Sequence, residues 1–175
     1  SCERAVYEGR LIDFQTALAR ANPPGYRTAC VFRIPPAPWL AAPRDAYEDW
    51  YLVDGSAALD PLNDAAVSGL CREPHDAAAS PAAGGIAGLY RLRAGEPVSR
   101  GGLSYWFAKP AGMSYPELYS LLQPFTDRQN VALWGRQMTL SPAAEFCLHT
   151  RDAVDLPLFL SAGLIERTTV WPAGA

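Results

Sequence analysis

The chain carries two hydrophobic patterns, one with the period of a helix and one with the period of a strand. Near the start, Leu11, Phe14 and Leu18 follow the spacing i, i+3, i+7, which is typical of one face of an amphipathic helix. Asn22-Pro23-Pro24-Gly25 then ends this helix, since proline cannot continue it. A short strand is expected before it, around Arg4–Glu8.

Runs rich in β-branched and aromatic residues, bounded by Gly, Pro and Asp, predict the remaining strands. These are Thr28–Ile34, Tyr47–Val53, Ile86–Arg93, Leu103–Ala108, Val131–Leu140, Glu145–Thr150 and Ile165–Trp171. Three further helices are expected: Ala57–Val67 with Ser56 as its cap, a helix from Ser114 to about Gln123 with Glu117 completing a capping box, and Asp152–Leu160.

The resulting element order is β-α-β-β-α-β twice, which is the split βαβ order of a ferredoxin-like unit. We therefore predict an α+β fold of two ferredoxin-like halves, 1–97 and 98–175, which form one compact structural domain. Their antiparallel sheets would pack face to face as an α+β barrel. Aligning the halves sets Tyr51 over Cys147 and brings Arg33 near Arg136.

The first half also resembles a known family. Leu11–Val67, with its Asn22-Pro23-Pro24-Gly25-Tyr26 turn and the Ser56-Ala57-Ala58-Leu59 helix entry, is similar to the dimeric α+β barrel superfamily. That superfamily includes small monooxygenases of antibiotic-biosynthesis type and haem-handling relatives. The resemblance implies a fold in which two sheets face each other, either by dimerisation or by tandem fusion. It implies no specific activity, because its motifs are structural.

Composition narrows the possible partners. The chain has 175 residues, of which 49% are hydrophobic and 19% charged, so it is no disordered protein. A net charge of −3 gives no electrostatic reason to expect nucleic acid or an anionic membrane. Lys109 is the only lysine, and the arginine, alanine and glycine usage is typical of a GC-rich bacterial genome. A buried arginine would be a strong candidate for binding an anion or a carbonyl.

The cysteines and the hydropathy pattern indicate in which cellular compartment the protein is expected. Cys2, Cys30, Cys71 and Cys147 form no CxxC motif, and we expect all of them to be reduced and metal-free. The sequence shows no apolar run of spanning length and no charged-then-apolar leader. We therefore expect a cytoplasmic protein, monomeric or homodimeric, with no membrane partner.

The hairpin of the second half holds the candidate site. A four-residue turn at 141–144 would place Arg136 opposite His149 and put both on one face with other polar and soft side chains. Arg136 would hold a carboxylate or enolate oxygen, and His149 would act as acid or base. The candidate ligand contacts are Trp134, Met138, Glu145, Arg151, Tyr51 and Arg33. The same pattern also fits a solvent-facing hairpin or a buried polar pair that only satisfies itself.

Other chemistry has weaker support. His75 beside Asp76 could ligate haem, but a solvated or capping histidine is the interpretation we favour. No P-loop, dinucleotide fingerprint or zinc spacing is present, so we expect no cofactor and no metal. Our prediction is a small-molecule-binding protein or cofactor-independent enzyme with its site between the two sheets. The alternatives are a non-catalytic structural or regulatory module and a haem-binding protein.

Overall fold

The structure is a computed structural model that describes residues 2–37, 46–97, 100–139 and 144–172. The chain is α+β, as the sequence predicts, with helices and antiparallel strands. It forms two compact units. Unit 1 comprises Ser1–Arg33, Tyr47–Gly84 and Thr169–Ala175, and unit 2 comprises Ile34–Ala46 and Gly85–Thr168. Among the described residues, no helix combines the length and the apolar composition that crossing a bilayer requires.

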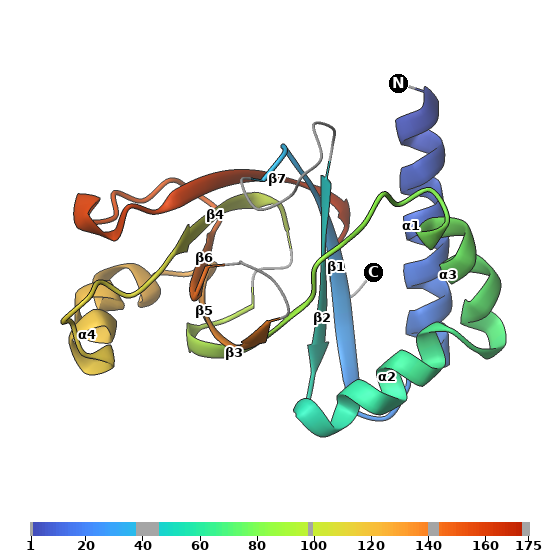
Figure 1. The fold of residues 1–175 in the computed structure, drawn as a ribbon, viewed down its shortest axis with the longest axis horizontal. Coiled ribbons are helices and arrows are strands. Elements are labelled where there is room, and N and C mark those ends of the chain that lie inside the picture. The colour runs from blue at the N-terminus through green and yellow to red at the C-terminus, as the bar shows by residue number, and fades with distance from the viewer. Residues whose placement is uncertain (1, 38–45, 98–99, 140–143, 173–175) are drawn as a thin grey trace. The chain divides into compact units, whose positions relative to one another are not determined.

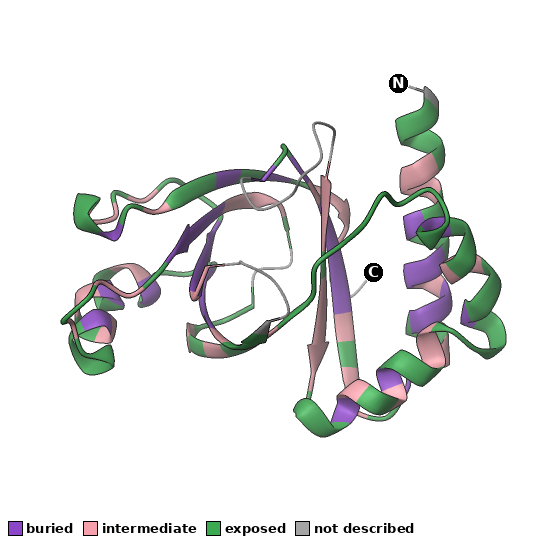
Figure 2. Cartoon of the chain, in the orientation of Figure 1, coloured by how far each residue is buried: buried purple, intermediate pink, exposed green. Residues whose placement is uncertain are grey.

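Unit 1 packs helices against two neighbouring strands (Figure 1). Its elements are α1 (Cys2–Ala21), β1 (Tyr26–Ile34), β2 (Ala46–Val53), α2 (Leu59–Ala66) and α3 (Arg72–Ala79), with 3₁₀ turns at Ser56–Ala58 and Gly69–Cys71. Figure 2 shows buried and exposed residues interleaved along α1, as expected for a helix with one buried side. Its core lies between α1 and the other elements: Leu11, Phe14, Leu18, Val31, Leu62, Cys71 and Ala78.

The turn between α1 and β1 explains why glycine stands at position 25. Gly25 has φ 79°, and a Cβ there would lie 2.6 Å from the Cβ of Ala58. Any other residue would be strained by its backbone and by this contact. The predicted turn is thus confirmed.

Two expectations for unit 1 are wrong. Arg4–Glu8 is not a strand, because α1 already begins at Cys2. Tyr7 packs on the cluster of Leu11, Val31 and Ala78, so this segment extends the buried face of the helix by one turn. Ser56 makes no capping hydrogen bond, and a 3₁₀ turn precedes α2 instead.

Unit 2 is an antiparallel sheet with one helix. Its elements are β3 (Gly88–Gly95), β4 (Gly102–Phe107), α4 (Tyr115–Thr126), β5 (Val131–Thr139), β6 (Phe146–Thr150), a 3₁₀ turn at Leu158–Leu160 and the first part of β7 (Gly163–Trp171). The strand order is β7-β4-β6-β5-β3. The strands of this sheet curl visibly in Figure 1.

The apolar face of the unit 2 sheet packs under α4. Ser114 accepts a hydrogen bond from the Glu117 amide while the Glu117 carboxylate accepts one from the Ser114 amide, so the capping box is confirmed. The helix then contributes Leu118 and Leu122 to the core. The strands contribute the rest of that face: Tyr105, Phe107, Val131, Leu133, Phe146 and Leu148.

The predicted helix Asp152–Leu160 is wrong. Only the 3₁₀ turn Leu158–Leu160 forms there. Pro157 has no amide hydrogen to donate and disfavours helical backbone at the residue before it, which prevents a continuous helix. Leu160 is nevertheless buried and fixes this segment to the core of unit 2.

Candidate functional site

The sheet face of unit 2 that points away from α4 carries a group of buried polar and aromatic side chains. In the strand register, Ser104 pairs with His149 and with Ile165, and Trp106 pairs with Cys147, which pairs with Trp134. Directly opposed residues of antiparallel strands point to the same face. Arg167 lies two residues beyond Ile165 on the same strand and shares this face. We call the group the polar face: Ser104, Trp106, Trp134, His149 and Arg167.

The centre of the polar face is a contact between two fully buried side chains. Nη1 of Arg167 lies 3.3 Å from Nδ1 of His149. Only 2% of His149 and 3% of Arg167 are exposed. Burial lowers the pKa of His149 well below its usual value, and the charge of Arg167 lowers it further. The imidazole is therefore neutral at physiological pH.

Ser104 is not placed to act as a nucleophile. Its Oγ accepts a hydrogen bond from Nε1 of Trp106 at 3.2 Å and donates to the carbonyl of Ile165 at 3.4 Å. The hydroxyl proton thus points to the backbone, whereas a serine nucleophile needs it directed to a base. Ser104 holds the Trp106 indole in place.

Aromatic rings flank the polar contact. The rings of Trp134 and His149 meet edge to face with centroids 6.4 Å apart, and those of Tyr90 and Trp106 do so at 6.0 Å. Such rings offer flat apolar surfaces for a ligand, and they also serve as ordinary packing. Tyr90 is half-buried, so solvent reaches this end of the face.

The predicted pairing of Arg136 with His149 is wrong by four residues. Ala132 lies opposite His149, and the Arg136 amide donates to the carbonyl of Glu145 at 2.8 Å. The reason is that β5 is longer than β6, and the part of β5 beyond β6 pairs with β3. Because the register is shifted by an even number of residues, each side chain still points to the predicted face of the sheet. Trp134 and His149 therefore do share one face. Arg136 is half-buried and pairs with Tyr90 of β3. Leu140, the predicted last residue of this strand, lies outside the described residues.

Glu145 binds a different part of unit 2. Its carboxylate accepts from the Tyr115 hydroxyl at 2.6 Å and from the Lys109 amide at 3.2 Å. Nζ of Lys109 donates to the carbonyl of Met113 at 2.6 Å and lies 5.4 Å from the centroid of the Tyr115 ring. Glu145 thus connects the start of β6 to the start of α4. Met138 and Arg151, two of the other predicted contacts, are exposed.

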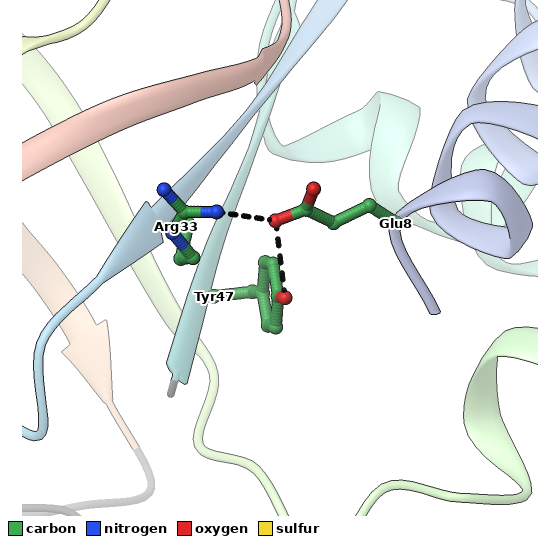
Figure 3. Close-up of polar contacts among 3 residues, drawn as sticks. All are labelled: Glu8, Arg33 and Tyr47. Atoms are coloured by element: carbon green, nitrogen blue, oxygen red, sulfur yellow. Dashed lines mark hydrogen bonds and ion pairs between the residues drawn. The ribbon is translucent and has the colours of Figure 1, made fainter. Parts of the chain in front are cut away.

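The two predicted residues of the first half lie in unit 1. Nη1 of Arg33 forms an ion pair with Oε1 of Glu8 at 2.9 Å, and the Tyr47 hydroxyl donates to the same oxygen at 3.3 Å (Figure 3). Tyr51 accepts from Nε2 of Gln15 at 3.1 Å. Burial is the main reason that the pKa of Tyr51 is raised, and nearby Asp49 adds to it. These contacts join α1 to the two strands.

Asp49 lies between Tyr47 and Tyr51 on β2. Desolvation by the surrounding protein raises its pKa to about 6, yet the residue remains exposed. Water that reaches the carboxylate stabilises its charged form and so opposes part of this shift.

His75 is the residue that the haem-binding alternative would use. His75 lies on α3, where its ring meets that of Phe14 edge to face at 5.5 Å and its Nδ1 lies 3.1 Å from Asp76. Within the described ranges, no three His, Cys, Asp or Glu side chains gather closely enough to hold a metal. Cys30, Cys71 and Cys147 are buried. Haem binding remains an untested alternative.

Two surface depressions lie away from the polar face. One of about 270 Å³ in unit 2 is lined by Tyr105 and residues of the segment that follows β6. The other, about 250 Å³, lies between α1 and α3 of unit 1 and is lined by Arg10, Asp13 and Glu73. Neither is lined by His149 or Arg136.

Arg167 is the residue that sequence reasoning missed. The signal for it was present in the sequence. Arg167 lies two residues after Ile165, so both side chains point to the buried face of the strand, whereas Glu166 and Thr168 point to the other face. A charged residue at an inward position of a strand is unusual and marks a site for inspection.

Comparison with protein-family models, curated proteins and solved structures finds no match for this chain.

Proposed function

We propose that the polar face binds a small molecule through an acceptor oxygen, either as a binding protein or as a cofactor-independent enzyme. The observation that carries this proposal is the buried contact between Arg167 and His149. The ligand class that fits is a planar molecule with a carboxylate or an enolate oxygen. A guanidinium recognises such an oxygen with paired donors, and the flanking indoles suit a flat ring.

Stability alone does not require this arrangement. Replacing a buried ionic group by an apolar side chain of similar size is often neutral or stabilising, so a buried charge is weak support for a purely structural role. Arg167 keeps its positive charge at every physiological pH, and its burial strengthens its attraction for an anion. A function that needs this charge is the simpler explanation for its presence.

We also propose that unit 2 is a ferredoxin-like unit, and its connectivity supports this proposal. The helix α4 joins β4 to β5, and β6 lies between these two strands, which is a split βαβ arrangement. β7 then flanks β4 on the other side. The support comes from the second half alone, because in the first half α1 occupies the segment where an initial strand was expected.

A binding experiment with matched probes tests the proposal. Trp106 and Trp134 lie on the polar face, so tryptophan fluorescence should report a ligand there. Benzoate should bind, and benzamide, which has the same shape without the charge, should bind more weakly. Arg167→Gln should weaken benzoate binding about 10- to 100-fold, because a charge-assisted pair contributes roughly 1.5–3 kcal/mol.

The control for this experiment is Arg91→Gln. Arg91 is an exposed arginine on β3 of the same unit, so its loss changes the net charge equally but leaves the polar face intact. Its benzoate affinity should equal that of the unmodified protein. Equal weakening by both variants, or no binding of either probe, would contradict the proposal.

A non-catalytic module is the second candidate. The observation that favours it is the near-complete burial of Ser104, His149 and Arg167, since a ligand must displace side chains to reach them. This candidate predicts that Arg167→Gln lowers the melting temperature while none of the probes binds.

A further inference from the structure

The direction of the hydrogen bond between Arg167 and His149 follows from chemistry. A guanidinium has five donor hydrogens and no acceptor. Nη1 of Arg167 lies 3.3 Å from Nδ1 of His149, so Arg167 donates and Nδ1 accepts. A ring nitrogen that accepts carries no proton of its own.

This direction fixes the tautomer of the imidazole. A neutral imidazole holds one proton, which here must sit on Nε2. A second proton would have to bind Nδ1, where it would face the Arg167 cation across 3.3 Å. Burial and the Arg167 charge both oppose that protonation, consistent with the lowered pKa of His149.

The side chains that the printed contacts and register place beside His149 are polar, apolar or cationic. By register, Ser104 of β4 and Ala132 of β5 lie opposite His149. Trp134 of β5 and Arg167 of β7 contact its ring. Arg136 lies farther along β5 on the same face and is a second cation. Each charge named here favours the neutral imidazole.

We infer that His149 is a fixed Nε2–H hydrogen-bond donor for a ligand oxygen and does not act as a base, with Arg167 as the residue that positions it. The lone pair that a base would use is already occupied by Arg167. The site therefore recognises a carboxylate or carbonyl oxygen and stabilises charge on it, as an oxyanion site does. This inference rests on the proposed function, since it concerns the ligand of the same face.

Nitrogen NMR of the histidine rings tests the tautomer directly. The sequence has two histidines, His75 and His149, and His75→Gln assigns the signals. In the unmodified full chain, His149 should show a proton on Nε2 and a bare Nδ1, and its ring should not titrate between pH 8 and pH 6. A proton on Nδ1, or titration near pH 6.5, would overturn the inference.

Adding benzoate then separates the inference from the proposed function. The Nε2–H signal of His149 should shift on saturation, and His149→Phe should weaken benzoate binding about tenfold with no change in its pH dependence between pH 6 and pH 8. Benzoate binding to a protein whose His149 carries its proton on Nδ1 overturns the inference and leaves the proposed function standing. An Nε2–H tautomer in a protein that binds neither probe removes the ligand role and the proposed function together.

Discussion

Arg33 in unit 1 and Arg167 in unit 2 are both strand arginines, but their surroundings differ. Arg33 is half-buried and pairs with the Glu8 carboxylate, which also accepts from Tyr47 (Figure 3). Arg167 is fully buried and donates a hydrogen bond to Nδ1 of His149. An arginine held by a carboxylate joins elements of its own unit. The Arg167 contact instead orients a histidine ring, which is the role that the proposed site needs.

The largest expected effect is the pH dependence of the free energy of unfolding that buried His149 of unit 2 causes. The unfolded chain protonates His149 near pH 6.5, whereas the folded protein holds it neutral. The unfolded state then binds more protons below pH 6.5, so this contribution to stability is complete above that pH and is lost as the pH falls. The loss should approach about 1.4 kcal/mol per pH unit.

Denaturant unfolding between pH 8 and pH 5 measures this effect as a difference between proteins. His149→Gln should remove the acid-dependent part, because glutamine keeps a donor and cannot titrate. The matched control is His75→Gln, which should retain the full pH dependence. If the control and His149→Gln behave alike, His149 is not the buried neutral group described here.

Paired substitutions of the two arginines should have opposite consequences. Arg33→Met breaks a partly exposed ion pair and should destabilise the protein by up to about 1 kcal/mol while leaving benzoate binding unchanged. Arg167→Met replaces a buried charge by an apolar chain of similar length, so it should change stability little or raise it, and abolish benzoate binding. Urea unfolding and fluorescence titration of both variants measure the two effects. Loss of binding in Arg33→Met would break the comparison.

The smallest expected effect belongs to Asp49. Its pKa in the folded protein is raised to about 6, above the unfolded value of about 3.9, so the folded state binds more protons between these values. Stability should therefore fall as the pH rises from 4 to 6. The fall in the free energy of unfolding should be less than about 1 kcal/mol, because the carboxylate is exposed and water screens it. Asp49→Asn should remove this fall. Unfolding curves at pH 4 and pH 7 measure it, and a stabilising effect of the ionised carboxylate would contradict the sign.

Local patterns in the sequence predicted the elements well and the long-range geometry less well. The capping box of Ser114 and Glu117 needs only neighbouring residues, and it is present. Strand alternation likewise placed Trp134 and His149 on one face. The register between β5 and β6 was missed by four residues, because it depends on how far β5 runs along β3, which is distant in sequence.

The site itself depended on a partner that no local pattern identifies. His149 was singled out for its chemistry, but its contact is Arg167, on a strand that joins the sheet from the far side of β4. Arg136 was preferred because a four-residue turn between two successive strands would place it opposite His149. Distance along the chain is a poor guide to contacts across a sheet, where strand order decides which side chains meet.

The most direct test of the central claim is the His149 ring signal with benzoate added to nitrogen-labelled protein. If Arg167 and His149 form an oxygen-binding site, the ring carries its proton on Nε2, does not titrate between pH 8 and pH 6, and its Nε2–H resonance shifts as benzoate saturates. In Arg167→Gln the shift should need about 10- to 100-fold more benzoate, and in Arg91→Gln it should need the same concentration as in the unmodified protein. A ring that titrates near pH 6.5, or a signal that benzoate leaves unmoved, would contradict the claim.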